Sequence, residues 1–188
     1  MELYEVIEKR RTIFVYKQPA SKEQLRRITL AGSKAPSAMN SQPWEFIIVE
    51  DQDLKDQIAE IKFQTVQNGP LKKKAPPEVV KEKALAQKNS FQNASVLAVC
   101  HKLNEASSSW CAIENMSLAA VAEGLGSGIV DYPEEGKKKI EGILGIPEDY
   151  ELTAVLKIGE IGKEPFPRDQ NPFGPVRPEF SWFHTNAF

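Results

Sequence analysis

The sequence predicts a single domain that mixes α-helices with β-strands, and three observations support this prediction. The chain has 188 residues, enough for one domain with a substantial core. Apolar residues recur at helical spacing in several stretches, as they do at Leu3, Val6 and Ile7. Continuous apolar runs such as residues 95–100 separate these stretches and are typical of buried strands. Periodicity predicts the elements but does not predict how the strands pair.

Composition excludes several classes of protein. The net charge of −2 argues against a nucleic-acid-binding protein, because neutralising phosphates requires a basic surface. Cys100 and Cys111 both lie in apolar patterns, so we expect two buried thiols and a reducing compartment rather than a disulfide framework. The N-terminus lacks the apolar core of a signal peptide, and no apolar run reaches membrane-spanning length. We therefore expect a cytoplasmic protein that does not enter a membrane.

The first elements are a helix over residues 3–9 and an extended stretch over residues 13–16. Between them stand Arg10, Arg11 and Thr12. A basic pair with a hydroxyl at a helix end can bind a phosphate through guanidinium contacts. The alternative interpretation is that the two cations only complement the dipole at the helix C-terminus.

The second helix begins at a capping box formed by Ser21 and Gln24, and its apolar face is expected to include Leu25, Ile28 and Leu30. It ends at a proline-bounded loop, residues 35–43, which leads into an apolar strand at residues 44–49. This loop offers hydroxyls and amides but no charge, and its donors and acceptors are Ser37, Asn40, Ser41 and Gln42. Such groups suit a ligand edge rich in carbonyls and ring nitrogens, although a capped helix end followed by a turn is the simpler alternative.

The central elements are a third helix capped by Asp53, a turn-rich break at residues 68–77 and a polar helix over residues 79–88. The strand at residues 95–100 follows and is expected to be central in the sheet. The next helix, residues 107–125, is apolar on most sides, so it must be buried in the core or against a second subunit. At this chain length we favour a subunit interface.

The glycines at residues 124–128 are predicted to end this helix and to open a loop at residues 129–132. They are no dinucleotide fingerprint, because they end a helix instead of following a strand. A helix over residues 133–145 and a strand at residues 152–158 come next. The tail, residues 163–188, is rich in proline and aromatic residues, and such exposed aromatics need a partner surface.

Side chains for acid–base, nucleophilic or metal chemistry do not gather in the sequence. The two histidines, His101 and His184, lie far apart and lack metal-ligand spacing, and there is no G-x-S-x-G motif. We therefore predict no metal site and no catalytic side chain. A cofactor could carry the reaction while the protein supplies orientation and electrostatics.

Residues 36–46, PSAMNSQPWEF, resemble the P-S-x-x-N-x-Q-P-W signature of the nitroreductase family of flavin-dependent oxidoreductases. Residues 10–14 resemble the family's R-R-S-x-R segment, whose basic residues hold the flavin phosphate, with Thr12 for serine and Phe14 at the third basic position. The stretches GLGS at 124–127 and LGIPEDY at 144–150 are also similar to family segments. The resemblance implies an α+β fold in one domain over residues 1–188, with a central, mostly antiparallel sheet flanked by helices. It also implies that residues 163–188 form an extended arm embracing the other subunit of a homodimer.

The same resemblance implies FMN as cofactor. The family's pattern places phosphate contacts at Arg10, Arg11 and Thr12, and backbone contacts beside the flavin ring at Val130 and Asp131. Contacts to ribityl and ring, from the opposite subunit, fall on Ser37, Ala38, Asn40 and Gln42. Trp44 is expected to pack behind the site, and either Arg177 or its rival Arg168 could reach the phosphate.

The implied activity is ping-pong hydride transfer from NADH or NADPH through the flavin to a small acceptor such as a nitroaromatic or a quinone. Phe14 and a poorly matching middle region motivate an alternative, a flavin-binding member with a specialised role that does not use NAD(P)H. A third possibility is a structural dimer that has lost its cofactor. Neither the physiological acceptor nor the choice of nicotinamide follows from the sequence.

Overall fold

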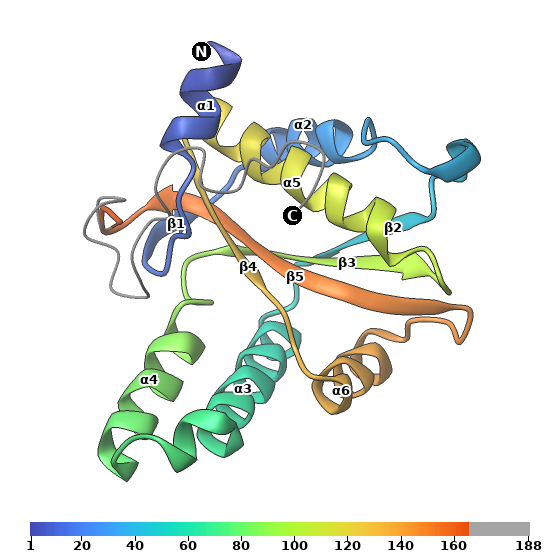
Figure 1. Cartoon of the computed structure of the whole chain (residues 1–188). Coiled ribbons are helices and arrows are strands. Elements are labelled where there is room, and N and C mark those ends of the chain that lie inside the picture. Colours follow the sequence, from blue (N-terminus) through green and yellow to red (C-terminus); the bar gives the residue numbers. More distant parts are fainter. Residues whose placement is uncertain (166–188) are drawn as a thin grey trace, which may run out of the picture.

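The computed structural model describes residues 1–165, which form one sheet covered by helices on both faces (Figure 1). The strands are β1 (Tyr16–Pro19), β2 (Trp44–Val49), β3 (Ser95–Lys102), β4 (Gly126–Val130) and β5 (Tyr150–Ile161). Their order is β1-β5-β3-β2, and β4 also pairs with β5. All these pairings are antiparallel, which confirms the predicted α+β fold with its antiparallel sheet.

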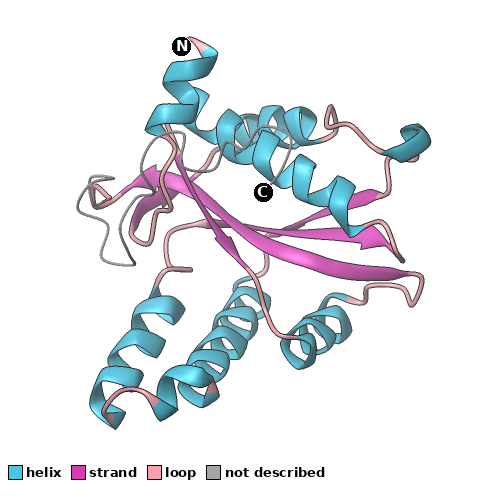
Figure 2. Ribbon diagram, viewed as in Figure 1, coloured by secondary structure: helices cyan, strands magenta, loops and turns pink. Residues whose placement is uncertain are grey.

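Two helical layers enclose the sheet, as Figure 2 shows. One layer contains α1 (Leu3–Lys9), α2 (Lys22–Gly32) and α5 (Ala106–Ala122), and the other contains α3 (Gln52–Asn68), α4 (Pro77–Asn89) and α6 (Glu134–Leu144). The middle of strand β3, residues 96–100, is apolar and packs against both layers. Leu97 and Val99 pack toward α2 and α5, whereas Val96 and Ala98 pack toward α3 and α6.

Most predicted helix ends are confirmed. Ser21 and Gln24 form the complete capping box at the start of α2. Gly124 and Gly145, with φ of 76° and 64°, follow the ends of α5 and α6, where a left-handed residue terminates a helix readily. The cap of α3 was predicted wrongly: the side chain of Asp51, not Asp53, accepts from the Leu54 N–H, so Asp53 lies in the first turn.

Four further expectations are corrected by the fold. Residues 126–130 form strand β4 rather than part of a loop, because they find a partner in β5. Residues 13–15 precede β1 and lie outside it. Leu30 is 56% exposed because its position on α2 points away from the sheet side held by Leu25 and Ile28. Cys100 is buried as expected, but Cys111 is exposed on α5.

None of the helices described in residues 1–165 combines the length and apolarity needed to cross a membrane. The predicted arm lies outside the described residues from position 166 onward, and so do Arg168 and Arg177. The role of that arm stays a prediction.

Candidate functional site

The basic segment, residues 10–14, is anchored to strand β4. Thr12 forms an isolated parallel bridge with Ser127, and the Ile13 N–H donates to the Ser127 carbonyl oxygen at 2.9 Å. Ile13 itself is buried beside Tyr16, whose hydroxyl donates to the Ile13 carbonyl oxygen at 3.0 Å. These contacts hold the basic segment alongside β4, although the segment is not part of any strand.

Gly128 makes this close approach possible. A Cβ atom at this position would lie 2.7 Å from the Ile13 carbonyl oxygen and 3.1 Å from the Tyr16 hydroxyl. A backbone oxygen cannot move aside as a flexible side chain can, so any larger residue would push the basic segment off β4. The glycine-rich stretch, predicted to end a helix and to suit close backbone approach, therefore also holds the candidate phosphate-binding residues in place.

The two arginines of the basic segment take different directions. Arg10 reaches Glu114 on α5, with 3.5 Å between Nε and Oε1. Arg11 folds back and donates to the carbonyl oxygens of Glu8 and Arg10, at 2.5 and 2.8 Å. Arg11 thus complements the C-terminal end of α1, as the alternative interpretation of this motif proposed. Thr12 is exposed beside them.

The polar loop, residues 37–42, contains the other half of the predicted site. It includes the short 3₁₀ turn Ala38–Asn40, and its backbone is left-handed at Met39, Asn40 and Gln42, with φ of 53°, 55° and 47°. Such angles are costly for residues other than glycine and cluster at ligand-binding loops. The Gln42 N–H donates to Ser37 Oγ at 3.0 Å, which closes the loop.

This loop is fixed to the start of α5 and is open to solvent. Ser41 Oγ donates to Glu105 Oε2 at 2.5 Å, and Glu105 is the N-cap residue of α5. Met39 at the tip is 99% exposed. Trp44, by contrast, is 7% exposed and packs with Ala35 and Ala112 behind the loop, as predicted.

Helix α5 separates the two halves of the predicted site. The polar loop is attached at its N-terminal end, and the bridge from Thr12 to Ser127 lies just beyond its C-terminal end. At 1.5 Å per residue a helix of this length spans about 25 Å. Figure 1 shows the basic segment near α1 and the loop at the far end of α5. The backbone attachment points of the two halves are therefore far apart along α5, although the Arg10 side chain reaches back to Glu114 at the middle of the helix.

Val130 and Asp131 lie where β4 ends, on the same strand that holds the basic segment. The Val130 side chain is buried. Asp131 is exposed: its carboxylate lies 3.2 Å from Lys137 Nζ, and its backbone carbonyl accepts from Lys62 Nζ at 3.0 Å. The structure thus brings Thr12, Val130 and Asp131 to one strand but leaves the residues of the polar loop apart from them.

Sequence reasoning missed Lys157 and Lys62. Lys157 lies in β5, is 1% exposed, and its burial lowers the pKa of its ammonium group to about 7. Burial also lowers the pKa of Lys62, which is half-buried on α3. The signal was available for Lys157, since one lysine interrupts the otherwise apolar stretch LTAVLKI. Lys62 carries no comparable signal, because lysines are ordinary on helices.

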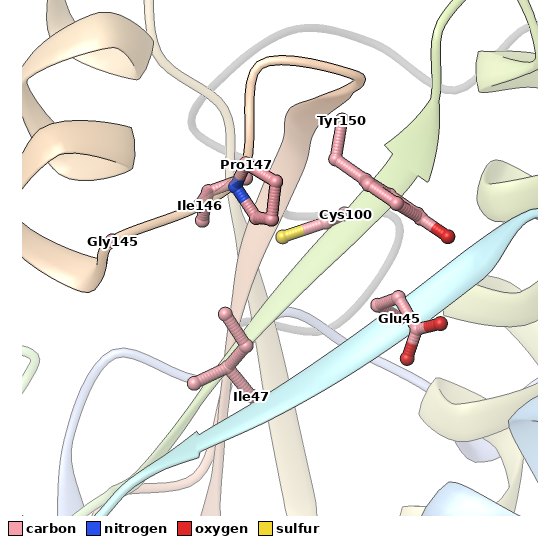
Figure 3. A pocket seen from close by; sticks show the side chains of 7 residues that line it. All are labelled: Glu45, Ile47, Cys100, Gly145, Ile146, Pro147 and Tyr150. Atoms are coloured by element: carbon pink, nitrogen blue, oxygen red, sulfur yellow. The ribbon is translucent and has the colours of Figure 1, made fainter.

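A separate pocket of about 270 Å³ opens at the other helical layer. Figure 3 shows Cys100 Sγ pointing toward Pro147, with Tyr150 beside it. Burial raises the pKa of the Cys100 thiol to about 12, so this pocket offers no thiolate nucleophile at neutral pH. Within residues 1–165, no three side chains of metal-ligating type gather into a candidate metal site.

Comparison with known proteins identifies the family. The family model described as "Nitroreductase family" matches residues 7–160. An iodotyrosine deiodinase of Thermotoga neapolitana is 31% identical over 183 residues, covering 89% of this chain and 94% of that protein. An NADH dehydrogenase of Thermus thermophilus is 28% identical over 186 residues, covering 87% of this chain and 89% of that protein.

A solved structure extends this likeness to the fold. Oxidized iodotyrosine deiodinase bound to FMN and 3-iodo-L-tyrosine matches with a TM-score of 0.75 and 28% identity, covering 97% of this chain and 100% of that chain. The chain therefore belongs to the nitroreductase family.

Proposed function

We propose that this protein is an FMN-dependent oxidoreductase of nitroreductase type that works as a homodimer. The observation that carries the proposal is the pair of complementary donor sets at the two ends of α5. Family membership and the FMN-bound deiodinase structure support FMN as the cofactor.

The residues present fit the two chemically different parts of FMN. Its phosphate is anionic, and the basic segment offers two guanidinium groups and the Thr12 hydroxyl. Its ring and ribityl chain are rich in carbonyls, nitrogens and hydroxyls, and the polar loop offers uncharged partners for them. The left-handed backbone and the hydrogen bond from the Gln42 N–H to Ser37 Oγ fix the positions of these polar groups in the loop. The basic segment and the polar loop each match one part and not the other.

A second copy of the chain would bring the two sets together. Several large apolar side chains are exposed in the layer of α1, α2 and α5, namely Leu3, Tyr4, Ile7, Leu30 and Trp110. Exposed apolar surface of this kind favours a protein interface. In a two-fold dimer the polar loop of one subunit can meet the basic segment of its partner. Light scattering at micromolar concentration tests this, and a monomer would contradict it.

Each group of residues then has one task. When bound, FMN supplies the hydride chemistry. Arg10, Arg11 and Thr12 bind its phosphate, and Arg177 or Arg168 adds a further cation. Val130 and Asp131 contribute backbone groups beside the ring. Ser37, Ala38, Asn40 and Gln42 of the opposite subunit orient ribityl and ring, and none of them titrates near neutral pH, so proton transfer is left to substrate and solvent.

We infer further that NADH or NADPH donates the hydride and that a nitroaromatic or a quinone accepts it. The relationship to an NADH dehydrogenase supports a nicotinamide donor. The test is stopped-flow mixing of the yellow holoprotein with NADH and with NADPH. Rapid bleaching of the flavin absorbance band is the expected result. A purified protein without a yellow chromophore that also fails to take up added FMN would overturn the whole proposal.

A second candidate function is a reductive reaction that does not use a nicotinamide. It is favoured by the 31% identity to an iodotyrosine deiodinase and by Phe14 in place of a basic residue. Titration of the oxidised holoprotein with 3-iodo-L-tyrosine discriminates the two. A perturbed flavin spectrum at micromolar ligand, together with no bleaching by NADH or NADPH, would select this alternative.

A further inference from the structure

Lys157 is a buried lysine that the proposed function has not used. It lies in the interior of the sheet, opposite Val96 of β3 and Gly128 of β4, and is 1% exposed. A buried ammonium is costly unless an anion or several acceptors compensate it. Within residues 1–165 no carboxylate comes within ion-pair distance of its Nζ. Its polar partner is the Ser90 hydroxyl, at 2.5 Å.

Two aromatic rings complete the surroundings of this ammonium group. Its Nζ lies 5.1 Å from the ring centroid of Phe91 and 5.7 Å from that of Phe14. Both distances are typical of cation–π contacts. Phe14 belongs to the basic segment and is 37% exposed, so its ring lies between the buried Lys157 ammonium group and the protein surface.

A second lysine faces the same region from the other direction. Lys62 Nζ donates to the Asp131 carbonyl oxygen at 3.0 Å and lies 5.3 Å from the ring centroid of Tyr132. Its charge adds to the burial that lowers the pKa of Lys157. The two ammonium groups therefore add positive charge near the end of β4, where the Asp131 carboxylate offsets part of the charge of Lys62.

We propose that the protonated form of Lys157, acting through the Phe14 ring and assisted by Lys62, supplies positive charge to the ring of the bound flavin. Lys157 is in this sense a positioning residue, because Phe14 and not its own ammonium group would face the cofactor. The inference rests on the proposed function, since it presupposes bound FMN.

The charge is placed for the ring rather than for the phosphate. The phosphate has the guanidinium groups of the basic segment, which are open to solvent, whereas Lys157 is dry and lies behind an aromatic face. A flavin ring gains negative charge when it is reduced, and a fixed cation in a low-dielectric site stabilises that charge. Lys157 should therefore favour the reduced cofactor over the oxidised one.

The experiment compares the affinities of the oxidised and reduced cofactor in wild type, Lys157→Met and Phe14→Arg/Lys157→Met. Lys139→Met is the matched control, because Lys139 pairs with Glu135 on the exposed face of α6. In Lys157→Met we expect oxidised FMN to bind within about threefold of wild type and the ratio of reduced to oxidised affinity to fall at least tenfold. Tenfold corresponds to a fall of about 30 mV in the flavin midpoint potential. The arginine in the double variant should restore at least half of that fall.

The same titrations with riboflavin separate ring from phosphate. An equal loss for riboflavin and FMN supports a charge that acts on the ring, and a loss confined to FMN overturns it. If the ratio of reduced to oxidised FMN affinity is the same in Lys157→Met as in wild type, the inference is also overturned. The protein would then still be a flavoprotein, and the proposed function would stand. Lys62→Met, a half-buried position, gives a second test, with a smaller shift of the same sign expected. Circular dichroism verifies that each variant is folded.

Discussion

The two halves of the proposed site are built in opposite ways. The basic segment is docked on β4 by a backbone bridge, is charged, and has buried residues directly beneath it. The polar loop is uncharged, has a left-handed backbone at three positions and is exposed to solvent. The first half is completed by its own chain, whereas the second presents its groups outward. Under the proposed function, assembly of two chains would therefore complete the site that one chain begins.

The strongest way to break this contrast is to prevent assembly. Trp110→Glu places a charge on the exposed apolar part of α5, where Trp110 is 39% exposed. We expect a folded monomer that has lost most of its FMN, measured by light scattering and by the absorbance ratio of flavin to protein. Leu85→Glu, at a residue 40% exposed on α4 of the other layer, should remain dimeric and yellow. A yellow monomer would show that one chain suffices.

The next effect concerns the titration of Lys157, which has no counterpart in the polar loop. Because the folded pKa is lowered to about 7 from 10.5, the unfolded chain binds more protons between these values. The stability of the flavin-free protein should therefore rise with pH over this window, by up to about 1.4 kcal/mol per pH unit. The nearest charged neighbour, Lys62 on α3, acts in the same sense. Urea unfolding of wild type and of Lys157→Met at several pH values isolates the contribution of Lys157 to stability. If the free energy of unfolding depends on pH in the same way in both proteins, the prediction is contradicted.

The docking of the basic segment is tested by Gly128→Ala. Its Cβ would meet the Ile13 carbonyl oxygen at 2.7 Å, so the segment must shift. We expect a cost of about 1–3 kcal/mol, seen as a melting temperature lower by roughly 2–10 °C, together with weaker FMN binding. Gly142→Ala is the matched control, because nothing lies within 4 Å of its added Cβ inside α6. That change should be neutral or slightly stabilising.

Replacement of Arg10 separates phosphate from ring. Arg10→Met should weaken FMN by about tenfold, because a charge-assisted contact is lost while its pairing with Glu114 is given up as well. Riboflavin affinity should be unaffected. The control is Arg27→Met, which removes an α2 arginine that binds Glu123 at the end of α5 and should change neither affinity. Equal losses for both ligands would place Arg10 outside the phosphate site.

The smallest effect is expected in the polar loop. Ser37→Ala removes the acceptor for the Gln42 N–H and so loosens the loop without changing its charge. One hydrogen bond contributes about 1 kcal/mol, so fluorescence titration should show FMN and riboflavin weakened alike, by roughly fivefold. Ser33→Ala, at the end of α2, removes a hydroxyl bonded to Leu30 and is the control. A loss seen with FMN alone would place Ser37 at the phosphate.

Local patterns predicted the elements well where one physical cause dominated. The capping box at Ser21, the stop at Gly145 and the strand at residues 95–100 each follow from neighbouring residues alone. Errors arose where a choice depended on tertiary partners. Asp51 and Asp53 are equally good caps in sequence, and the glycines at 126–128 form a strand only because β5 lies beside them.

The candidate site divides in the same way. The polar loop could be recognised from residues 36–46 because its chemistry is contiguous in sequence. The positive charge behind Phe14 could not, because it arrives from β5, more than 140 residues later in the chain. Its distance from Phe14 in sequence hides a proximity that depends on the register of β4 against β5. The exposure of Cys111 likewise depends on which side of α5 faces the sheet.

Helix α5 sets a distance as well as a boundary. In a symmetric pair of chains each copy of α5 would carry one donor set at either end, so its length would act as a gauge that fixes both cofactor positions together. Inserting one helical turn, about 5.4 Å, would misalign the two positions simultaneously. A change in the length of α5 would then affect both cofactor sites of the dimer equally. Dimers with one intact site would arise only when two different chains combine.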